Sequence, residues 1–273
     1  MKLLPLALAA AAFSNLATAT VVNIDFTTTS GTGYTGLGAS DIVDTGTTWN
    51  TAAYSGSGGS VTMTDMVDSS GAATLVDFTV SGIEGAQNPA GSMERLGGFS
   101  NLMRDYIRID AVTTGAVLSV GGKFSGLVVG ASYDLYFYGQ GEHMAPGGPP
   151  SANYGQNSLF TVNGTSKQTG WDGTANGDGS LDEGIEYVKF TAIAINGGAE
   201  GGVINFNWAN VVATGATPNV LADEATNGST PPANTGSRFA ALNGIQLVSI
   251  VPEPSSALLA LLGMTGLLVR RRR

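Results

Sequence analysis

Ile204-Asn205-Phe206-Asn207-Trp208 places three large apolar side chains at alternate positions, with an asparagine between each pair. Successive side chains of a β-strand point to opposite faces of its sheet, so this period of two predicts a strand with one buried face. The same alternation recurs at 22–26, 76–80, 106–110, 118–120, 134–138, 160–162, 187–190 and 242–250. Clusters of Gly, Ser, Asn and Thr separate these runs, as is typical of turns between strands.

No stretch between residues 20 and 250 keeps a helical period of 3.6 for three turns, so the sequence predicts an all-β fold. About nine or ten strands with long loops favour two antiparallel sheets packed face to face, a jelly-roll-like sandwich. No shift in composition divides this region into two domains. We expect binding surfaces in the longest irregular stretches, which are 30–60, 84–101, 140–156 and 209–237. The Gly-, Ser- and Thr-rich stretch 27–60 could alternatively form a loosely ordered arm.

The N-terminus has the pattern of an export signal. Met1-Lys2 is followed by an apolar run from Leu3 to Phe13 and by Ala17-Thr18-Ala19, a small-residue cleavage site. The sequence therefore predicts a signal helix over residues 1–19, removed by signal peptidase after Ala19. A buried core helix is the alternative interpretation of the apolar run.

The C-terminus, residues 251–273, combines three features in a fixed order. Val251-Pro252-Glu253-Pro254 cannot join a helix, because the two prolines fix φ and remove backbone donors. Residues 255–269 are uncharged and apolar, and as a helix they would span about 22 Å, short of the ~30 Å hydrocarbon core of a bilayer. Arg270, Arg271, Arg272 and Arg273 follow. We expect a short transmembrane helix whose basic end stays on the cytoplasmic side.

These three elements resemble the PEP-CTERM sorting signal of exported bacterial proteins. The resemblance implies that an exosortase-type membrane protease recognises the tail and cuts near Pro252-Glu253-Pro254. The protein would then be anchored in the bacterial membrane only transiently, before it reaches the cell surface or an extracellular matrix. An ordinary C-terminal anchor that is never cut is the alternative.

Composition limits the partners of the 20–250 ectodomain. Without Lys2, the four terminal arginines and Glu253, the chain keeps 7 basic and 20 acidic residues, a net charge of about −13. Such a charge disfavours nucleic acid and anionic membrane surfaces as partners. The chain contains no cysteine, which excludes disulfide scaffolds and cysteine chemistry.

The arrangement of the predicted strands resembles the galactose-binding-like β-sandwiches. The matching segments are 131–139, 158–164, 186–190, 202–208 and 241–248, with Leu242-Asn243-Gly244-Ile245-Gln246-Leu247 in the place of the closing strand. The resemblance is one of pattern and covers no tight motif. It implies sugar binding without indicating a site.

An acidic, glycine-rich segment at 172–183 can be aligned with a twelve-residue calcium loop. The aligned oxygen ligands are Asp172, Asn176, Asp178 through its carbonyl, Ser180 and Glu183. Thr174 is a poor ligand at the third position, and Gly179 replaces the apolar anchor of such loops. A solvated acidic hairpin is the alternative, and calcium is the one cofactor that the sequence suggests.

Aromatic side chains give a second candidate site. Tyr136 and Tyr138 alternate with the predicted core residues of their strand, and Trp171 lies in a loop. Exposed rings of this kind stack on sugar faces, so these three residues are candidates for ligand binding. Trp49, Tyr54 and Tyr154 are further aromatic residues in predicted loops. The alternative is that neighbouring loops cover these rings.

The sequence indicates no catalytic residues. The single histidine, His143, follows Glu142 in a Pro- and Gly-rich loop, but no nucleophile motif accompanies it. We therefore expect a non-catalytic structural or adhesive protein of the surface or matrix, with extracellular polysaccharide as a candidate partner. A carbohydrate-binding module, calcium-dependent if the 172–183 loop binds the ion, is the first alternative. A glycoside-active enzyme with two carboxylates facing a cleft is the second.

Overall fold

The computed structural model describes residues 19–29, 31–40, 47–56, 58–88, 99–111, 116–141, 157–170, 180–195, 197–198, 201–211 and 239–250. Strands dominate these residues, and the α-helix among them, α2 (Ser100–Arg104), has five residues. The prediction of a mostly β, multi-stranded antiparallel fold is confirmed.

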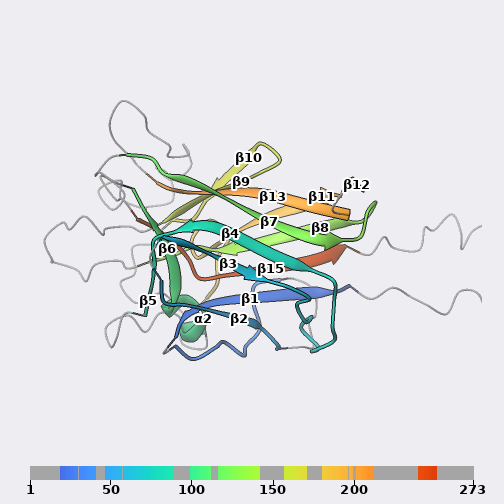
Figure 1. Ribbon diagram of the computed structural model, residues 1–273, viewed down its shortest axis with the longest axis horizontal. Coiled ribbons are helices and arrows are strands. Elements are labelled where there is room, and N and C mark those ends of the chain that lie inside the picture. The colour runs from blue at the N-terminus through green and yellow to red at the C-terminus, as the bar shows by residue number, and fades with distance from the viewer. Residues whose placement is uncertain are drawn as a thin grey trace, which may run out of the picture.

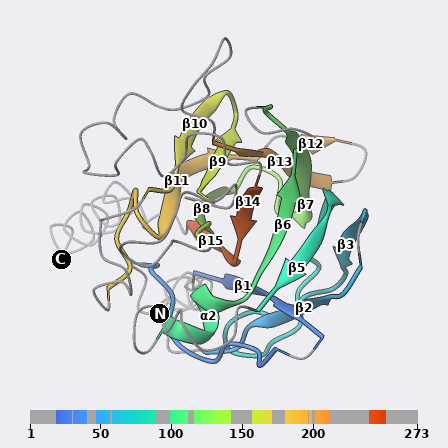
Figure 2. The same ribbon diagram turned by 90° about the vertical axis from the view of Figure 1, so that its left-hand side faces the viewer.

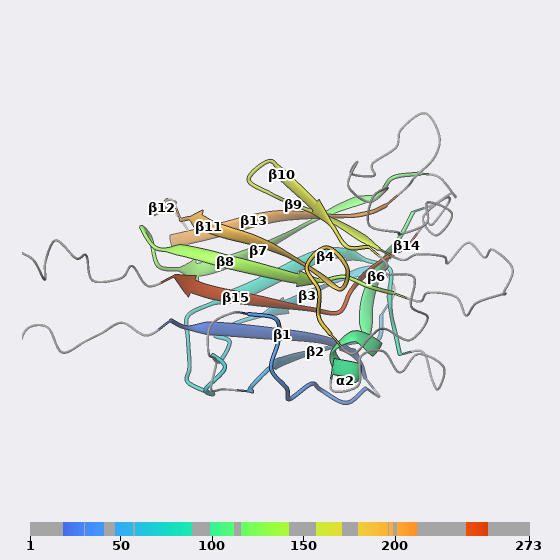
Figure 3. The ribbon, with the colours of Figure 1, turned by 180° about the vertical axis from the view of Figure 1, so that it is seen from behind.

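Five strands form the first sheet, in the order β11-β8-β15-β1-β2. Their bounds are β11 (Tyr187–Ala194), β8 (Ser132–Tyr138), β15 (Gly244–Ile250), β1 (Val21–Thr28) and β2 (Asn50–Tyr54). Figure 3 shows these strands in this order. Neighbours are antiparallel except β1 and β2, which run parallel. This parallel pair departs from the purely antiparallel sheets that the sequence predicts.

Seven strands form the second sheet, in the order β10-β9-β13-β7-β4-β3, with β12 added to β13. Their bounds are β10 (Thr165–Gln168), β9 (Ser158–Val162), β13 (Gly201–Asn210), β7 (Ser119–Leu127), β4 (Asp77–Ile83), β3 (Gly59–Met63) and β12 (Gly197–Gly198). All pairs in this sheet are antiparallel. The strand around Phe206 is β13, near the centre of the sheet.

The two sheets pack against each other through the apolar side chains predicted to face inward. Phe137 of the first sheet lies 4.6 Å from Phe160 and 4.9 Å from Phe206 of the second, measured between ring centroids. Phe26 of the first sheet likewise lies 5.7 Å from Phe78. The core is therefore a layer of interlocking aromatic and branched side chains between two sheets, as in a β-sandwich.

A third, small sheet crosses one end of this sandwich, in the order β14-β6-β5. Its strands are β14 (Phe239–Leu242), β6 (Tyr106–Asp110) and β5 (Gly85–Gln87). In Figure 1 β5 and β6 run across the left-hand ends of the long strands, and Figure 2 looks onto this end. Ile107, Ile109 and Leu242 are fully buried and join the main core.

Asn243 fixes the bend by which the chain leaves β14 and enters β15. The residue is fully buried, and its side-chain amide donates to the carbonyls of Met103 and Asp105 at 2.9 and 3.1 Å. Its side-chain oxygen accepts a hydrogen bond from the amide of Gln140 at 2.8 Å. These contacts tie the small sheet, the end of α2 and the start of the loop after β8 to one point.

Two predictions about local order are wrong. The stretch 30–60, which the sequence presents as irregular or as a loose arm, contains β2 and the start of β3. In addition, residues 21–27 of β1 are buried at every position, not on alternate positions. The second face of β1 is covered because residues 34–39 and Trp49 pack over it.

The two chain ends of the described ectodomain lie side by side. Thr20 precedes β1 and exchanges hydrogen bonds with Ser249 of β15, at 2.6 Å to its hydroxyl and 2.8 Å from its amide. Both ends therefore lie at the end of the sandwich opposite the small sheet (Figure 3). Within the residues described, no helix is long and apolar enough to cross a membrane. The predicted signal helix up to Thr18 and the predicted transmembrane helix in 251–273 lie outside those residues.

Candidate functional site

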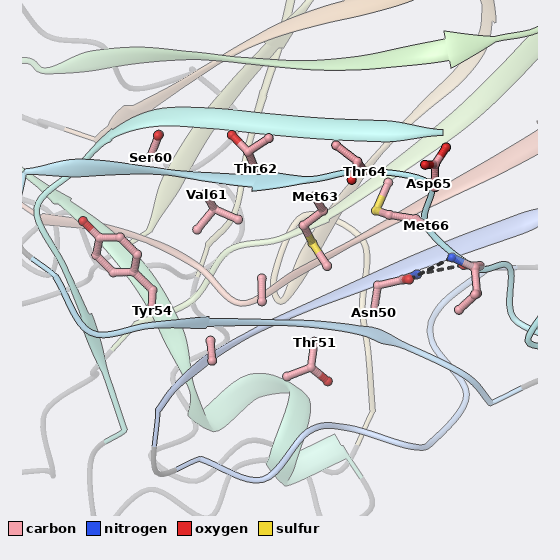
Figure 4. Close-up of a pocket in the computed structure, with 13 residues that line it drawn as sticks. Asn50, Thr51, Tyr54, Ser60, Val61, Thr62, Met63, Thr64, Asp65 and Met66 are labelled. Carbon is pink, nitrogen blue, oxygen red and sulfur yellow. Dashed lines mark hydrogen bonds between the residues drawn. The ribbon is translucent and has the colours of Figure 1, made fainter. Parts of the chain in front are cut away.

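A groove opens between β2 and β3, the neighbouring edge strands of opposite sheets. It has a volume of about 490 Å³ and is lined by residues 50–54 and 60–67. This volume lies within the range typical of ligand-binding sites, about 300–1,000 Å³. Figure 4 shows the groove between the two strands, with side chains entering it from both.

The alternation of side chains along the two strands gives the groove its character. Ala52 of β2 and Val61 of β3 are buried and face inward, whereas Thr51, Ala53 and Thr62 are exposed. Met63 and Met66 also project towards the groove (Figure 4). Ala52 has a small side chain, and together with Val61 it forms an apolar floor to the groove.

Both ends of the groove are fixed by hydrogen bonds. Asn50 accepts from the amide of Val67 at 2.9 Å and donates to the carbonyls of Val67 at 2.8 Å and Asn23 at 2.9 Å. At the other end, the hydroxyl of Tyr54 donates to the carbonyl of Ile83 at 3.3 Å. A Cβ on Gly59 would lie 2.7 Å from that hydroxyl, so the absence of a side chain there lets the ring pack against the β2–β3 connection.

The chemistry of the lining suits binding. Asp65 is the one ionisable acid among the lining residues, and no base lies beside it in the lining. The other lining side chains are apolar or carry an amide or a hydroxyl group. The groove therefore offers an apolar floor with amide and hydroxyl groups around it, which can hold an extended ligand.

A second feature is a buried polar cluster on the face of the first sheet that points away from the core between the two sheets. Asp25 and Asp105 are 0 % and 3 % exposed, and the hydroxyl of Thr27 donates to Asp105 Oδ2 at 2.5 Å. The amide of Tyr34 donates to Asp25 Oδ2 at 2.9 Å, whereas Asp25 Oδ1 has no hydrogen-bond partner among the described residues. The sequence gives no sign of this cluster, since its members are up to 80 residues apart.

Burial dominates the electrostatics of this cluster. Burial is the main reason why the pKa of Asp25 is raised to about 7. The hydrogen bond from the Tyr34 amide lowers this pKa, and the nearby charge of Asp105 raises it further. Burial also raises the pKa of Asp105, although the hydrogen bond from Thr27 and the charge of Arg104 oppose it. A carboxyl group with a pKa near 7 is protonated in a large fraction of molecules at neutral pH.

The exposed tyrosine platform predicted from the sequence is wrong. Tyr136 and Tyr138 do point away from the sandwich core, but they are only 1 % and 0 % exposed. They pack in a second apolar cluster with Tyr34, Trp49, Leu102 and Met103. Tyr34 belongs to residues 34–39, here called the covering loop, and Leu102 and Met103 belong to α2. The rings are therefore buried by neighbouring segments, as the alternative interpretation has it. Trp171 lies outside the described residues.

Tyr138 holds the covering loop onto the sheet. Its hydroxyl accepts from the amide of Ala39 at 2.6 Å and donates to Gln246 Oε1 at 2.5 Å. We expect Tyr138→Phe to lower the free energy of unfolding by about 1–3 kcal/mol, because the partly buried amide of Ala39 and the buried side-chain oxygen of Gln246 each lose a hydrogen bond. Urea unfolding followed by fluorescence measures this. An unchanged free energy of unfolding would show that the loop is not held by this hydroxyl.

The proposed calcium loop is described only in part. Of its candidate ligands, Asp172, Asn176 and Asp178 lie outside the described residues, whereas Ser180 and Glu183 lie within them. Glu183 Oε1 accepts from Lys167 Nζ of β10 at 2.9 Å. Calcium binding therefore stays a prediction, and in the described part of the chain no group of three acidic or histidine side chains is placed to hold a metal.

Several other predicted residues also lie outside the described part. These are Ala17 of the cleavage site, Glu142, His143, Tyr154, and all of 251–273 with the Pro-Glu-Pro and arginine elements. Of the remaining aromatic candidates, Trp49 is buried and donates to the carbonyl of Gly36 at 2.8 Å. Tyr54 belongs to a strand and lines the groove, so it does not lie in a loop as expected.

The groove is not apparent from the sequence. Asn50–Tyr54 and Gly59–Met63 are short and rich in small residues, so their alternation is weak. The alternation of Val61 and Met63 with Ser60 and Thr62 is the sequence signal that could have indicated β3. No protein-family model matches the chain, and no curated protein is similar to it.

Proposed function

We propose that this chain is an exported surface or matrix protein that holds another molecule without chemical change. The observation that carries the binding role is the open β2–β3 groove, whose lining combines an apolar floor with few ionisable groups. The proposal includes a jelly-roll-like connectivity of the chain and its resemblance to galactose-binding-like sandwiches. Extracellular polysaccharide is an alternative ligand, which the hydroxyl side chains along β3 would favour.

The position of the chain ends supports the sorting part of the proposal. Thr20 and Ser249 are hydrogen-bonded neighbours, so a signal peptide and a C-terminal tail would both leave the same end of the sandwich. The membrane would then lie at that end, and the small sheet would point away from it. The groove runs along the side of the sandwich, where a membrane at the end would not cover it.

Mass spectrometry of the mature protein tests the sorting proposal at both ends. In a host with signal peptidase and an exosortase, we expect a chain that begins at Thr20 and ends near 251–254. Replacing Pro252 and Pro254 by alanine should leave the tail attached, because residues 251–254, predicted to be extended, can then join the predicted apolar helix. Full-length protein recovered from the cytosol with both ends intact would contradict the proposal.

A further inference from the structure

We propose that the groove binds an extended peptide strand of another exported protein, which pairs with the outer edges of both β2 and β3. This inference rests on the proposed function, because it takes the groove as the binding site. It specifies the ligand as a polypeptide backbone in β conformation. Four features of the described structure lead to it.

The first feature is a pair of open strand edges. β2 is the last strand of its sheet and pairs only with β1, and β3 is the last strand of the other sheet and pairs only with β4. Among the described residues, nothing pairs with the outer edge of either strand. Each edge therefore carries unpaired backbone donors and acceptors beside the groove, which is the arrangement that accepts an added strand.

The second feature is the match between two spacings. Packed sheets lie about 10 Å apart, and hydrogen-bonded strands lie about 4.8 Å apart. One strand that lies along the outer edges of both strands, at the mouth of the groove, can thus reach backbone groups on either side. Both strands have five residues, and they run in opposite directions, since Tyr54 lies by Gly59 and Asn50 by Val67. The incoming strand would be parallel to one and antiparallel to the other.

The third feature is the lack of edge protection on this side alone. Natural sheets block open edges with charged side chains, especially lysine, and with proline. The other edge strands of the two sheets follow this rule, with Lys167 in β10 and Lys189 in β11. β2 reads NTAAY and β3 reads GSVTM, without a charge or a proline. These two edges are the unprotected pair.

The fourth feature is charge. Asp65 lies at the end of the groove beyond β3 and is exposed, and its amide donates to the carboxylate of Asp77 at 2.9 Å. Two carboxylates at this end, on a chain with a net charge of −9, favour a strand that carries a positive charge there. Its inward side chains must be small or branched and apolar to pack on Val61, Met63 and Met66.

The probe is a synthetic peptide, acetyl-Lys-Thr-Val-Thr-Val-Thr-Val-amide, labelled with a fluorophore and titrated with the mature ectodomain. We expect saturable binding by fluorescence anisotropy. A second peptide of the same sequence carries N-methyl groups on alternate amides, which remove hydrogen-bond donors and keep the side chains. This peptide should bind at least about tenfold more weakly, because it cannot pair with both edges.

Two variants on the opposite edge strands of the first sheet localise the binding. Ala52→Met fills the groove from its floor and should weaken binding of the peptide at least about tenfold. Ala194→Met is the matched control, because Ala194 is an exposed alanine of β11, at the other edge of the same sheet, and does not line the groove; this variant should bind as the unaltered protein does. Far-UV circular dichroism checks that both variants fold.

Any of the following outcomes would overturn the inference. Absence of saturable binding, equal affinity for the N-methylated peptide, or full binding by Ala52→Met each contradict strand addition. Dimerisation that Ala52→Met abolishes would identify a second copy as the occupant. Binding of an oligosaccharide that Ala52→Met abolishes, with no binding of the peptide, would refute the peptide strand and leave the proposed function intact.

Discussion

Replacing Phe206 by alanine is expected to lower the free energy of unfolding by about 3–5 kcal/mol, the usual cost of removing a buried aromatic ring. Phe206 is 3 % exposed and lies at the meeting point of the two sheets. Its ring centroid is 4.9 Å from that of Phe137 in the opposite sheet, and 6.1 and 6.4 Å from those of Phe78 and Phe124 in its own. Removing the Phe206 ring would leave a cavity beside all three of these rings.

Urea unfolding of the variant measures this loss. Leu75→Ala is the control, because Leu75 is 76 % exposed and its truncation should change the free energy of unfolding by less than about 0.5 kcal/mol. A loss below about 1 kcal/mol for Phe206→Ala would show that the sheets do not depend on this ring. Phe206→Asp should prevent folding, since it adds an unpaired charge to the same site.

Gly122 gives an independent check on the position of this ring. A Cβ on Gly122 of β7 would lie 2.1 Å from the tip of the Phe206 ring, so the ring occupies the space above the glycine. Gly122→Ala should therefore destabilise the protein by about 1–3 kcal/mol through overpacking. The same change should cost less in the Phe206→Ala background. Additive costs in this double-mutant cycle would mean that the two residues do not touch.

The strands that the sequence predicts are those with large apolar residues at alternate positions. The alternation of Phe206 and Trp208 with asparagines needs no information from elsewhere in the chain, because the period alone gives the face. β2 and β3 were missed because Ala52 and Val61 are their buried residues, and one small inward residue gives little contrast with Thr51 or Thr62. Their place in the fold comes from pairing with β1 and β4, which is a long-range property.

The second limit concerns what covers a sheet. The period of two correctly puts Tyr136 and Tyr138 on the opposite face from Leu135 and Phe137. It does not tell whether that face meets solvent, and here residues 34–39 and α2 bury it. The same covering loop desolvates Asp25. Sequence patterns therefore predicted the orientation of these side chains, and their environment required the tertiary structure.

Asp25→Asn is expected to remove most of the loss of stability that the protein suffers as the pH rises from about 4 towards 7. The pKa of Asp25 is about 7 in the folded protein, against the ordinary aspartate value of 3.8 in the unfolded chain. Between these values the folded protein keeps a proton that the unfolded chain has released. A raised carboxyl pKa therefore gives full stability below pH 4 and loses it as the pH rises towards 7.

The difference in free energy of unfolding between the original protein and Asp25→Asn should fall by about 3 kcal/mol from pH 5 to pH 8. Asparagine keeps an oxygen that can accept the hydrogen bond from the Tyr34 amide, and it stays neutral at every pH. Urea titrations at several pH values measure this difference. In an Asp105→Asn background the fall should shrink, since the charge of Asp105 is one cause of the raised pKa of Asp25. A difference that stays constant across this range would mean that Asp25 is ionised in the folded protein, and that the loop bearing Tyr34 admits water to it.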